Sequence, residues 1–261
     1  MKSSQLTIDL NCDMGELSLA IADGTQEALM RSITSANVAC GGHAGDEKTM
    51  RATIEQALQY KVAIGAHPGY ADRENFGRLE LKMATEQVAG SVFEQVRALA
   101  EVAEGCRARL AHVKPHGALY NQAVRDRELA GAIAEGVARW SREVVLVGLA
   151  GSPMLEVFRA AGFAVAAEAF ADRRYEPDGT LRSRKFDDAL IRDPAEAGRQ
   201  ALGMVEQGLV TASDGSEVAI AAQTICIHGD TPGATAIAAE VRRVLIGAGV
   251  RVAALAGEGS D

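Results

Sequence analysis

Residues 46–67 read DEKTMRATIEQALQYKVAIGAH, a helical segment followed by a short apolar run. In the first part, apolar side chains recur at the spacing of a helix that buries one face. They are Met50, Ile54, Ala57 and Leu58. The run Val62–Ala66 has the length of a strand and no charged residue, which is typical of a strand covered on both sides. The stretch therefore predicts a helix over 46–60 that leads into a buried strand.

The same alternation extends along the chain. Six further strand-length runs are mainly apolar: Leu6–Leu10, Asn37–Cys40, Leu110–Val113, Val144–Leu149, Ala164–Ala167 and Thr224–Ile227. Helical spacing recurs in 85–103 and 127–140. Three later helices are expected to begin with an N-cap and a proline, since a proline at the first helical position loses no hydrogen bond. These pairs are Ser152-Pro153, Asp193-Pro194 and Thr231-Pro232.

Alternating strands and helices indicate an α/β fold with a mostly parallel sheet. About seven such units in 261 residues predict one catalytic domain over 1–261, a (β/α) barrel with about seven parallel strands. An open doubly wound sheet is the alternative, although no glycine-rich GxGxxG follows the first run. Two polar stretches, 172–192 and 209–221, are expected to be excursions from the barrel, the second of them a hairpin.

The composition excludes several classes of protein. Hydrophobic residues make up 48% and charged residues 24%, as in a folded globular domain. The net charge of −8, from 27 Lys and Arg against 35 Asp and Glu, disfavours a nucleic acid or an anionic membrane as partner. No apolar run reaches the length of a signal peptide or a membrane span. The four cysteines form no CxxC pair, so we expect free thiols and a cytoplasmic location.

All five histidines lie close to the C-terminal end of an apolar run: His43, His67, His112, His116 and His228. Other polar residues follow the runs or flank these histidines: Asn11, Asp13, Glu16, Lys114, Glu168, Asp172, Arg173 and Asp230. The C-terminal ends of parallel strands meet on one face, where loops build the active site. We therefore expect eight of these side chains to converge: Asp13, His43, His67, Lys114, His116, Glu168, His228 and Asp230. The sequence therefore predicts a titratable pocket suited to acid–base or metal chemistry.

Some of these residues also have purely structural interpretations. His112 lies inside its apolar run, so we expect it in the core, and Asp46 is expected to cap the helix that begins there. Arg173 and Arg174 fit a solvated loop as well as a cationic wall of the pocket. The cysteines near strand ends are expected to be small buried side chains rather than nucleophiles: Cys12, Cys40 and Cys226.

Six motifs follow one another along the chain. They are IDLNCDMGE (8–16), SANVACGGHAGD (35–46), AIGAHPGY (63–70) with FGR (76–78), HVKPHGALYN (112–121), EAFADRRYEPDGTL (168–181) and ICIHGDTPGA (225–234). Together they resemble the LamB/YcsF family, over nearly the whole chain from residue 7 to about 250. Gly42 departs from the family, which more often has an aromatic residue there, and this is expected to loosen the pocket wall.

The resemblance implies a fold, a reaction and partners. It implies a barrel of the kind found in polysaccharide deacetylases. It also implies the role of the A subunit in a 5-oxoprolinase, which opens 5-oxoproline to L-glutamate with ATP as co-substrate, with Mg²⁺, in a complex with subunits B and C. The chain has no GxxxxGK[ST], so ATP is not held by a Walker loop. Either the partners phosphorylate the substrate, or the glycine-rich loops of the barrel hold the phosphate.

The resemblance also implies roles for the residues at the strand ends. Asp13 or His67 is expected to be the base that activates water. Lys114, His116 and Arg173 would supply positive charge, and Glu168 or Asp230 would orient an imidazole or bind the amine. Thus the expected catalytic residues are Asp13, His67, Lys114, Glu168 and Asp230. The expected substrate-binding residues are Asn11, Glu16, Asn37, His43, His116, Arg173 and His228.

Two rival functions remain open. In a metal-dependent deacetylase or amide hydrolase, Asp13, His43 and His67 would bind Zn²⁺. The pair in His112-x-x-x-His116 is a poorer candidate, because the intervening Pro115 makes a helical pair improbable, and HExxH is absent. In the second rival, the chain binds 5-oxoproline without catalysis and presents it to its partners.

Overall fold

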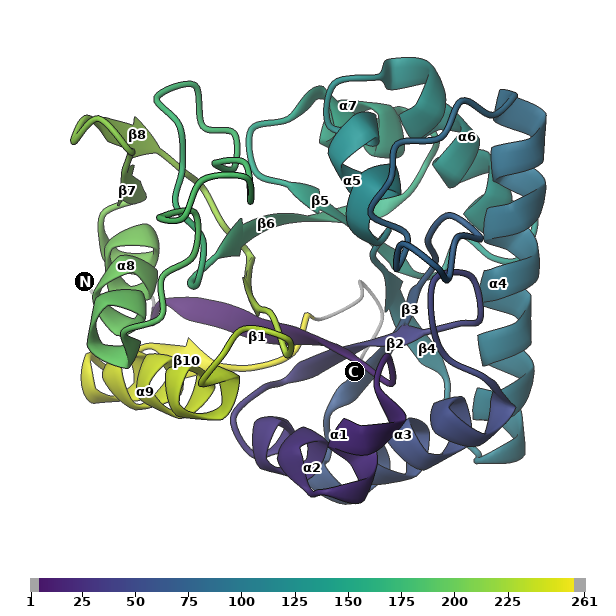
Figure 1. Cartoon of the computed structure of the whole chain (residues 1–261), viewed down its shortest axis with the longest axis horizontal. Coiled ribbons are helices and arrows are strands. Elements are labelled where there is room, and N and C mark those ends of the chain that lie inside the picture. The colour runs from purple at the N-terminus through teal and green to yellow at the C-terminus, as the bar shows by residue number, and fades with distance from the viewer. Residues whose placement is uncertain (1–4, 256–261) are drawn as a thin grey trace.

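The computed structural model describes residues 5–255 of the chain. Within them, seven parallel strands form a ring in the order β1-β2-β3-β4-β5-β6-β9 (Figure 1). They are β1 (Thr7–Met14), β2 (Ser35–Ala39), β3 (Ala63–His67), β4 (Leu110–Val113), β5 (Val145–Leu149), β6 (Ala164–Phe170) and β9 (Thr224–Ile227). The ring closes because β1 pairs with β2 on one edge and with β9 on the other. The predicted barrel is confirmed, and the open sheet is wrong.

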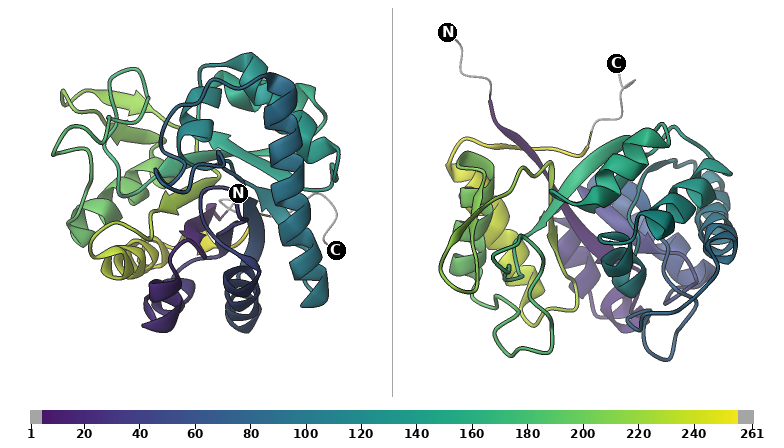
Figure 2. Two further views of the ribbon diagram at one scale, coloured as in Figure 1. Left: turned by 45° about the vertical axis from the view of Figure 1, so that its right-hand side comes forward. Right: turned by 90° about the horizontal axis from the view of Figure 1, so that it is seen from above.

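Helices surround the barrel, with the long α4 running along its outside (Figure 2). They are α1 (Ser18–Ala22), α2 (Thr25–Met30), α3 (Glu47–Tyr60), α4 (Thr85–Gly105), α5 (Gly117–Ala123), α6 (Arg127–Ala138), α7 (Pro153–Ala160), α8 (Pro194–Glu206) and α9 (Ala234–Gly247). In α3, Met50, Ile54 and Ala57 are buried as predicted, whereas Leu58 is 45% exposed and lies outside the buried face. No helix within residues 5–255 combines the length and the apolar character that a membrane span requires.

The predicted helix starts are right in two of three cases. Asp193 caps α8 by accepting a hydrogen bond from the Ala195 amide at 3.0 Å, and α7 begins at Pro153 after Ser152. The start predicted at Thr231-Pro232 is wrong, because α9 begins at Ala234 after Gly233, whose φ is 82°. Thr231 does not cap this helix, since its hydroxyl instead donates to Asp172 Oδ2 at 2.7 Å.

The N-cap expected at Asp46 is present. Its carboxylate accepts a hydrogen bond from the Thr49 amide at 2.8 Å, and the Thr49 hydroxyl accepts one from the Asp46 amide at 2.8 Å. This reciprocal capping box begins α3 directly after the loop that carries His43. Asp46 is therefore a structural residue of the helix start.

Much of the inside of the barrel is polar, which the sequence did not predict. β1 runs on to Met14 rather than ending near Leu10, so Asn11 and Asp13 lie within the strand. Along β1 the apolar Leu10 and Cys12 join the hydrophobic core, whereas Asn11 bonds side chains of other strands. β6 likewise continues to Phe170 and places Glu168 inside the strand. The polar residues thus come from alternate positions that point into the barrel.

His112 lies in this interior, as expected of a core residue. Its side chain is buried, and its Nε2 is 2.7 Å from Asn37 Oδ1. The neighbouring strand makes room for it, because a Cβ at Gly65 would lie 2.1 Å from His112 Nε2. Gly65 is therefore needed for the close approach of β3 and the imidazole.

Two excursions leave the barrel. β7 (Leu209–Thr211) and β8 (Glu217–Ala219) pair antiparallel as a hairpin. The loop 172–192 packs against this hairpin, because the Ser213 amide donates to the Tyr175 carbonyl oxygen at 2.8 Å. A last short strand, β10 (Arg251–Val252), pairs with the start of β1.

Candidate active site

A buried lysine is the centre of the polar barrel interior. Lys114 Nζ lies 2.9 Å from Glu168 Oε1, 3.0 Å from Asp13 Oδ1 and 3.3 Å from Asn11 Oδ1. Asn37 Nδ2 donates to both Asn11 Oδ1 and Asp13 Oδ1 at 2.8 Å. We call Asn11, Asp13, Asn37, Lys114 and Glu168 the lysine network. It links side chains from four different strands, or their ends, beneath one rim of the barrel.

The charges of this network stabilise one another. Burial opposes the Lys114 ammonium, but Asp13, Cys226 and Glu168 hold the pKa of that group well above its usual value. Burial would raise the pKa of Asp13, but His67 and Lys114 hold it well below its usual range. Both groups are therefore ionised, and the ammonium is a fixed positive charge at the base of the site.

Next to this network lies a second group, which we call the imidazole cluster: Glu16, His43, His67 and His116. Glu16 Oε1 is 3.0 Å from His43 Nε2 and 3.3 Å from His116 Nδ1. His67 Nε2 is 3.0 Å from His116 Nδ1 and 3.3 Å from Asp13 Oδ2, which joins the cluster to the lysine network. The rings of His43 and His116 stack with centroids 3.6 Å apart.

Burial sets the protonation of the cluster. Burial, and then His67, lower the pKa of His43 to about 2, so this imidazole is neutral. Burial, and then His67 and His43, also lower the pKa of His116. Burial, and then Asp13, raise the pKa of Glu16 to about 7, so its carboxyl group changes charge near neutral pH. His43 and His116 therefore offer neutral imidazole nitrogens, and Glu16 offers a carboxyl group that titrates near neutral pH, and both kinds of group can bind a metal ion.

Two glycines allow the imidazoles to pack this closely. A Cβ at Gly69 would lie 2.8 Å from His43 Nδ1, and one at Gly77 would lie 2.7 Å from His43 Cβ. Gly77 also has a φ of 62°, which favours glycine. The glycines of the HPGY and FGR motifs therefore leave room for the imidazole cluster, because any larger residue there would collide with His43.

Gln95 on α4 supports this site, and sequence reasoning missed it. Its side chain accepts from the Gly69 amide at 3.0 Å and donates to the Gly69 carbonyl oxygen at 2.8 Å. A Cβ at Gly42 would lie 2.2 Å from Gln95 Oε1, so Gln95 fills the space beside Gly42. The expected loosening of the pocket wall at Gly42 is therefore wrong. No sequence signal marks Gln95. It lies on the buried face of α4, among residues whose spacing predicts only a helix.

Asp172 is a second residue that the sequence placed at a strand end without giving it a role. Its carboxylate is 3.0 Å from His228 Nδ1 and accepts from the Thr231 hydroxyl at 2.7 Å. Burial would raise the pKa of Asp172, but His228 and Thr231 hold it below its usual range. The His228 ring also stacks on Phe170, with centroids 5.3 Å apart. Asp172 therefore orients His228 toward the cavity.

These groups open into a cavity of about 810 Å³ at the C-terminal end of the strands. Eight of the residues predicted for the site line it: Asp13, Glu16, His67, Lys114, His116, Arg173, His228 and Asp230. The remaining predicted residues lie buried behind them: Asn11, Asn37, His43 and Glu168. The convergence at one strand end occurs as predicted, and the cavity has the size of a small-molecule site.

The two carboxylates expected to orient an imidazole have other partners. Glu168 bonds Lys114 and also accepts from Asn11 Nδ2 at 3.1 Å. Asp230 lies at the rim, 2.5 Å from Arg78 Nη2 and 3.4 Å from Arg184 Nη1. The loops that carry these arginines could not be placed from the strand pattern, so the sequence did not predict these pairs.

The arginines and cysteines resolve alternatives that the sequence left open. Arg173 is buried against the cavity and donates to the Arg182 carbonyl oxygen at 2.6 Å, whereas Arg174 pairs with Glu196 at 2.7 Å. Arg173 is therefore no solvated loop charge.

The three cysteines near strand ends are buried as predicted: Cys12, Cys40 and Cys226. Burial raises the pKa of Cys40 to about 12, which makes its thiol a poor nucleophile.

The structure groups the possible metal ligands differently from the sequence. Glu16, His43, His67 and His116 each have a donor atom within 4.8 Å of the others. Asp13, which the sequence joined to His43 and His67, keeps a contact of 3.3 Å with His67 Nε2 but is not part of this group, and its other oxygen bonds Lys114 and Asn37.

Comparison with known proteins finds relatives that match nearly the whole chain. The LamB/YcsF family model matches residues 8–259. The 5-oxoprolinase A subunit from Chloroflexus aggregans is 50% identical, and the match covers 95% of this chain and 98% of that one. The 5-oxoprolinase A subunit from Methylococcus capsulatus is 49% identical, with 96% of each chain covered.

Solved structures show the same architecture. A lactam utilization protein from Thermus thermophilus superposes with a TM-score of 0.89 at 43% identity, covering 96% of this chain and all of that one (100%). A family 4 carbohydrate esterase from Streptomyces lividans reaches a TM-score of 0.51 at 9% identity, covering 97% and 95%. This last likeness concerns the fold alone, and it agrees with the predicted barrel of the polysaccharide deacetylase type.

Proposed function

The chain belongs to the LamB/YcsF family, and from that membership we propose that it is the A subunit in an ATP-dependent 5-oxoprolinase and carries the site where the lactam opens. The observation that supports this most is the near-complete match to relatives that carry the name of the 5-oxoprolinase A subunit. In this proposal it works with subunits B and C, and the substrate 5-oxoproline occupies the cavity above the lysine network.

Opening of the lactam requires activation of the carbonyl carbon and protonation of the ring nitrogen. A lactam carbonyl carbon is a poor electrophile, and phosphorylation of its oxygen by ATP, with Mg²⁺, makes attack by water feasible. The water loses a proton as it adds to that carbon, the ring C–N bond breaks, and the nitrogen takes up a proton to become the amine of glutamate. A second water then releases the phosphate. The site must therefore supply a base, a proton donor and positive charge.

The two groups of side chains match these needs. Lys114 and Arg173 supply positive charge beside the cavity, for the phosphorylated oxygen and the substrate carboxylate. His67 is the better base of the two that the sequence suggested, because the neighbours of Asp13, His67 and Lys114, hold the pKa of that carboxyl well below its usual range and make it a weak base. In this proposal His228, which Asp172 orients and which lines the cavity, donates to the leaving nitrogen.

The test is reconstitution with subunits B and C. L-glutamate and ADP are measured with 5-oxoproline and ATP present, and with each component omitted in turn. We expect glutamate only from the complete mixture, since the lactam must be activated before it opens. Glutamate from this chain alone, without ATP, would contradict the proposal.

A second measurement decides whether the chain catalyses or only binds. We expect His67→Gln, in the assembled complex, to lower turnover by about 10²–10⁴-fold while the affinity for 5-oxoproline stays unchanged. Arg109→Gln, at the opposite end of the barrel, is the matched control and should leave both values unchanged. Loss of affinity alone in His67→Gln would favour the rival in which the chain only presents the substrate.

A further inference from the structure

The four residues of the imidazole cluster each direct one donor atom toward the other three, and these atoms all lie within 4.8 Å of one another. Glu16 Oε1 lies 3.0 Å from His43 Nε2 and 3.3 Å from His116 Nδ1, and His116 Nδ1 lies 3.0 Å from His67 Nε2. In a tetrahedral zinc site with bonds of about 2.0–2.1 Å, neighbouring donor atoms are about 3.3 Å apart. The separations in the cluster are therefore close to those of ligands around one ion.

The backbone fixes which nitrogen of the His67 and His116 rings faces the other ligands. His67 Nδ1 lies 2.7 Å from the Lys114 carbonyl oxygen, and His116 Nε2 lies 2.9 Å from the Phe76 carbonyl oxygen. A carbonyl oxygen only accepts, so these two nitrogens carry the hydrogens. The remaining nitrogens, His67 Nε2 and His116 Nδ1, lie 3.0 Å apart, and at least one of them must offer a lone pair to the other. Carbonyl groups behind imidazoles commonly orient metal ligands in this way.

A proton can satisfy one pair of these atoms but not the whole cluster. It would join two acceptors, such as the facing nitrogens of His67 and His116. The Glu16 carboxylate and the stacked ring of His43, whose plane is 6° from that of His116, point to the same region. A divalent cation accepts several donors at once and offsets the carboxylate charge in a buried place.

We propose that Glu16, His43, His67 and His116 bind one divalent transition metal ion, with Zn²⁺ as the best fit to three imidazoles and a carboxylate. This set differs from the one that the sequence suggested, since Glu16 and His116 take the place of Asp13. When bound, such an ion supplies a water ligand of lowered pKa. That use rests on the proposed function and would replace His67 as the base, whereas the binding itself does not depend on it.

The test measures binding in the whole chain, apart from activity. Chelator-treated protein is titrated with Zn²⁺ and, separately, with Mg²⁺ by calorimetry, and Co²⁺ is added to record its visible absorption. We expect one Zn²⁺ per chain, a Co²⁺ spectrum of tetrahedral type, and much weaker binding of Mg²⁺, which prefers oxygen ligands. Failure of Zn²⁺ to bind the wild-type chain would overturn the proposal, and this result needs no variant to fold.

Three variants locate the ion. Glu16→Gln and His43→Gln should weaken Zn²⁺ binding at least about 100-fold, since each removes a ligand. His228→Gln is the matched control, because His228 lines the same cavity and bonds Asp172 outside the cluster. Circular dichroism confirms that each variant is folded. Loss of binding in His228→Gln with retention in His43→Gln would place the ion at the other group, Asp13, Cys226 and His228, and sink the proposal.

The two proposals can fail separately. Turnover of 5-oxoproline is measured with subunits B and C on the same preparations. Zn²⁺ binding without turnover would contradict the proposed function and leave the metal site standing. Full turnover in a chain that binds no Zn²⁺ would contradict the metal site alone.

Discussion

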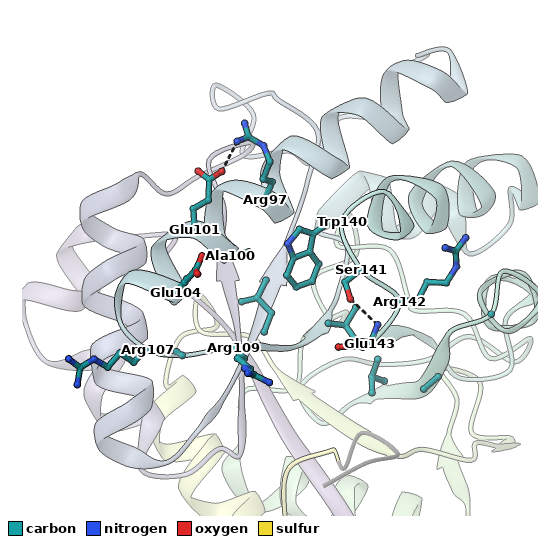
Figure 3. Close-up of a pocket in the computed structure, with 16 residues that line it drawn as sticks. Arg97, Ala100, Glu101, Glu104, Arg107, Arg109, Trp140, Ser141, Arg142 and Glu143 are labelled. Carbon is teal, nitrogen blue, oxygen red and sulfur yellow. Dashed lines mark hydrogen bonds and ion pairs between the residues drawn. The ribbon is translucent and has the colours of Figure 1, made fainter.

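The two ends of the barrel each carry a cavity, and the larger one is not the candidate active site. At the N-terminal end of the strands, a cavity of about 1340 Å³ lies around Trp140, just beyond the end of α6 (Figure 3). Its charged residues pair along a helix, as Arg97 does with Glu101, and their side chains are 45% and 61% exposed. At the C-terminal end, the side chains of Lys114 and Glu168 are 4% and 0% exposed, and they come from the residue after β4 and from β6.

The burial of charged side chains distinguishes the two ends and identifies the one suited to catalysis. Exposed ion pairs within one helix form at little cost and contribute little. Buried charges are costly, and a fold keeps them only where their partners satisfy them closely. Cavity volume would have selected the N-terminal end. The density of buried, mutually bonded charges selects the C-terminal end, where parallel strands also gather their loops.

The largest expected effect is at Lys114. Lys114→Met should lower the free energy of unfolding by about 3–5 kcal/mol, because it leaves Asp13 and Glu168 buried without their cation. Arg97→Met at the other end is the matched change and should cost less than about 1 kcal/mol. Urea denaturation of both variants measures this. Equal stability of the two variants would contradict the difference in charge burial from which the C-terminal end was assigned as the site.

A smaller effect is expected at Asp172, with a defined dependence on pH. Asp172→Asn should destabilise the fold by about 1–3 kcal/mol at neutral pH, since the carboxylate accepts bonds from His228 and Thr231. The pKa of Asp172 is lowered in the folded state, so its contribution is present above the unfolded value of about 3.9. It is lost as the pH falls through the folded value.

Urea denaturation from neutral to acidic pH measures this difference between wild type and variant. The difference should be constant at neutral pH and shrink in acid. Asp187→Asn on the exposed part of the 172–192 loop is the control, with an expected change within about 0.5 kcal/mol. A difference that grows in acid would mean that Asp172 is not stabilised as an anion.

The smallest effect separates close packing from backbone strain. Gly77→Ala and Gly162→Ala both place a side chain at positive φ, 62° and 87°, which costs about 1–2 kcal/mol. At Gly77 the new Cβ would also lie 2.7 Å from His43 Cβ, whereas at Gly162 the nearest atom is 3.9 Å away. We expect Gly77→Ala to be the less stable by thermal denaturation, and equal melting temperatures would show that the imidazole cluster is loosely packed.

Much of the architecture follows from local patterns. The apolar runs and the helical spacing in 46–60, 85–103 and 127–140 predicted the strands, the helices and the closed parallel barrel. Histidines such as His67 and His116 were assigned to one face because all parallel strands end on it. These features depend on periodicity and chain direction, which a single sequence contains.

Only the tertiary structure decided which side chains meet. Residues far apart in the chain are joined by the register of the strands around the ring, as when Lys114 reaches Asp13 and Glu168. The polar interior, the place of Glu16 among the imidazoles and the filling of the Gly42 space by Gln95 have the same origin. Periodicity says which face of an element is buried, but the partner of a buried polar group depends on the closed three-dimensional arrangement of all strands and loops.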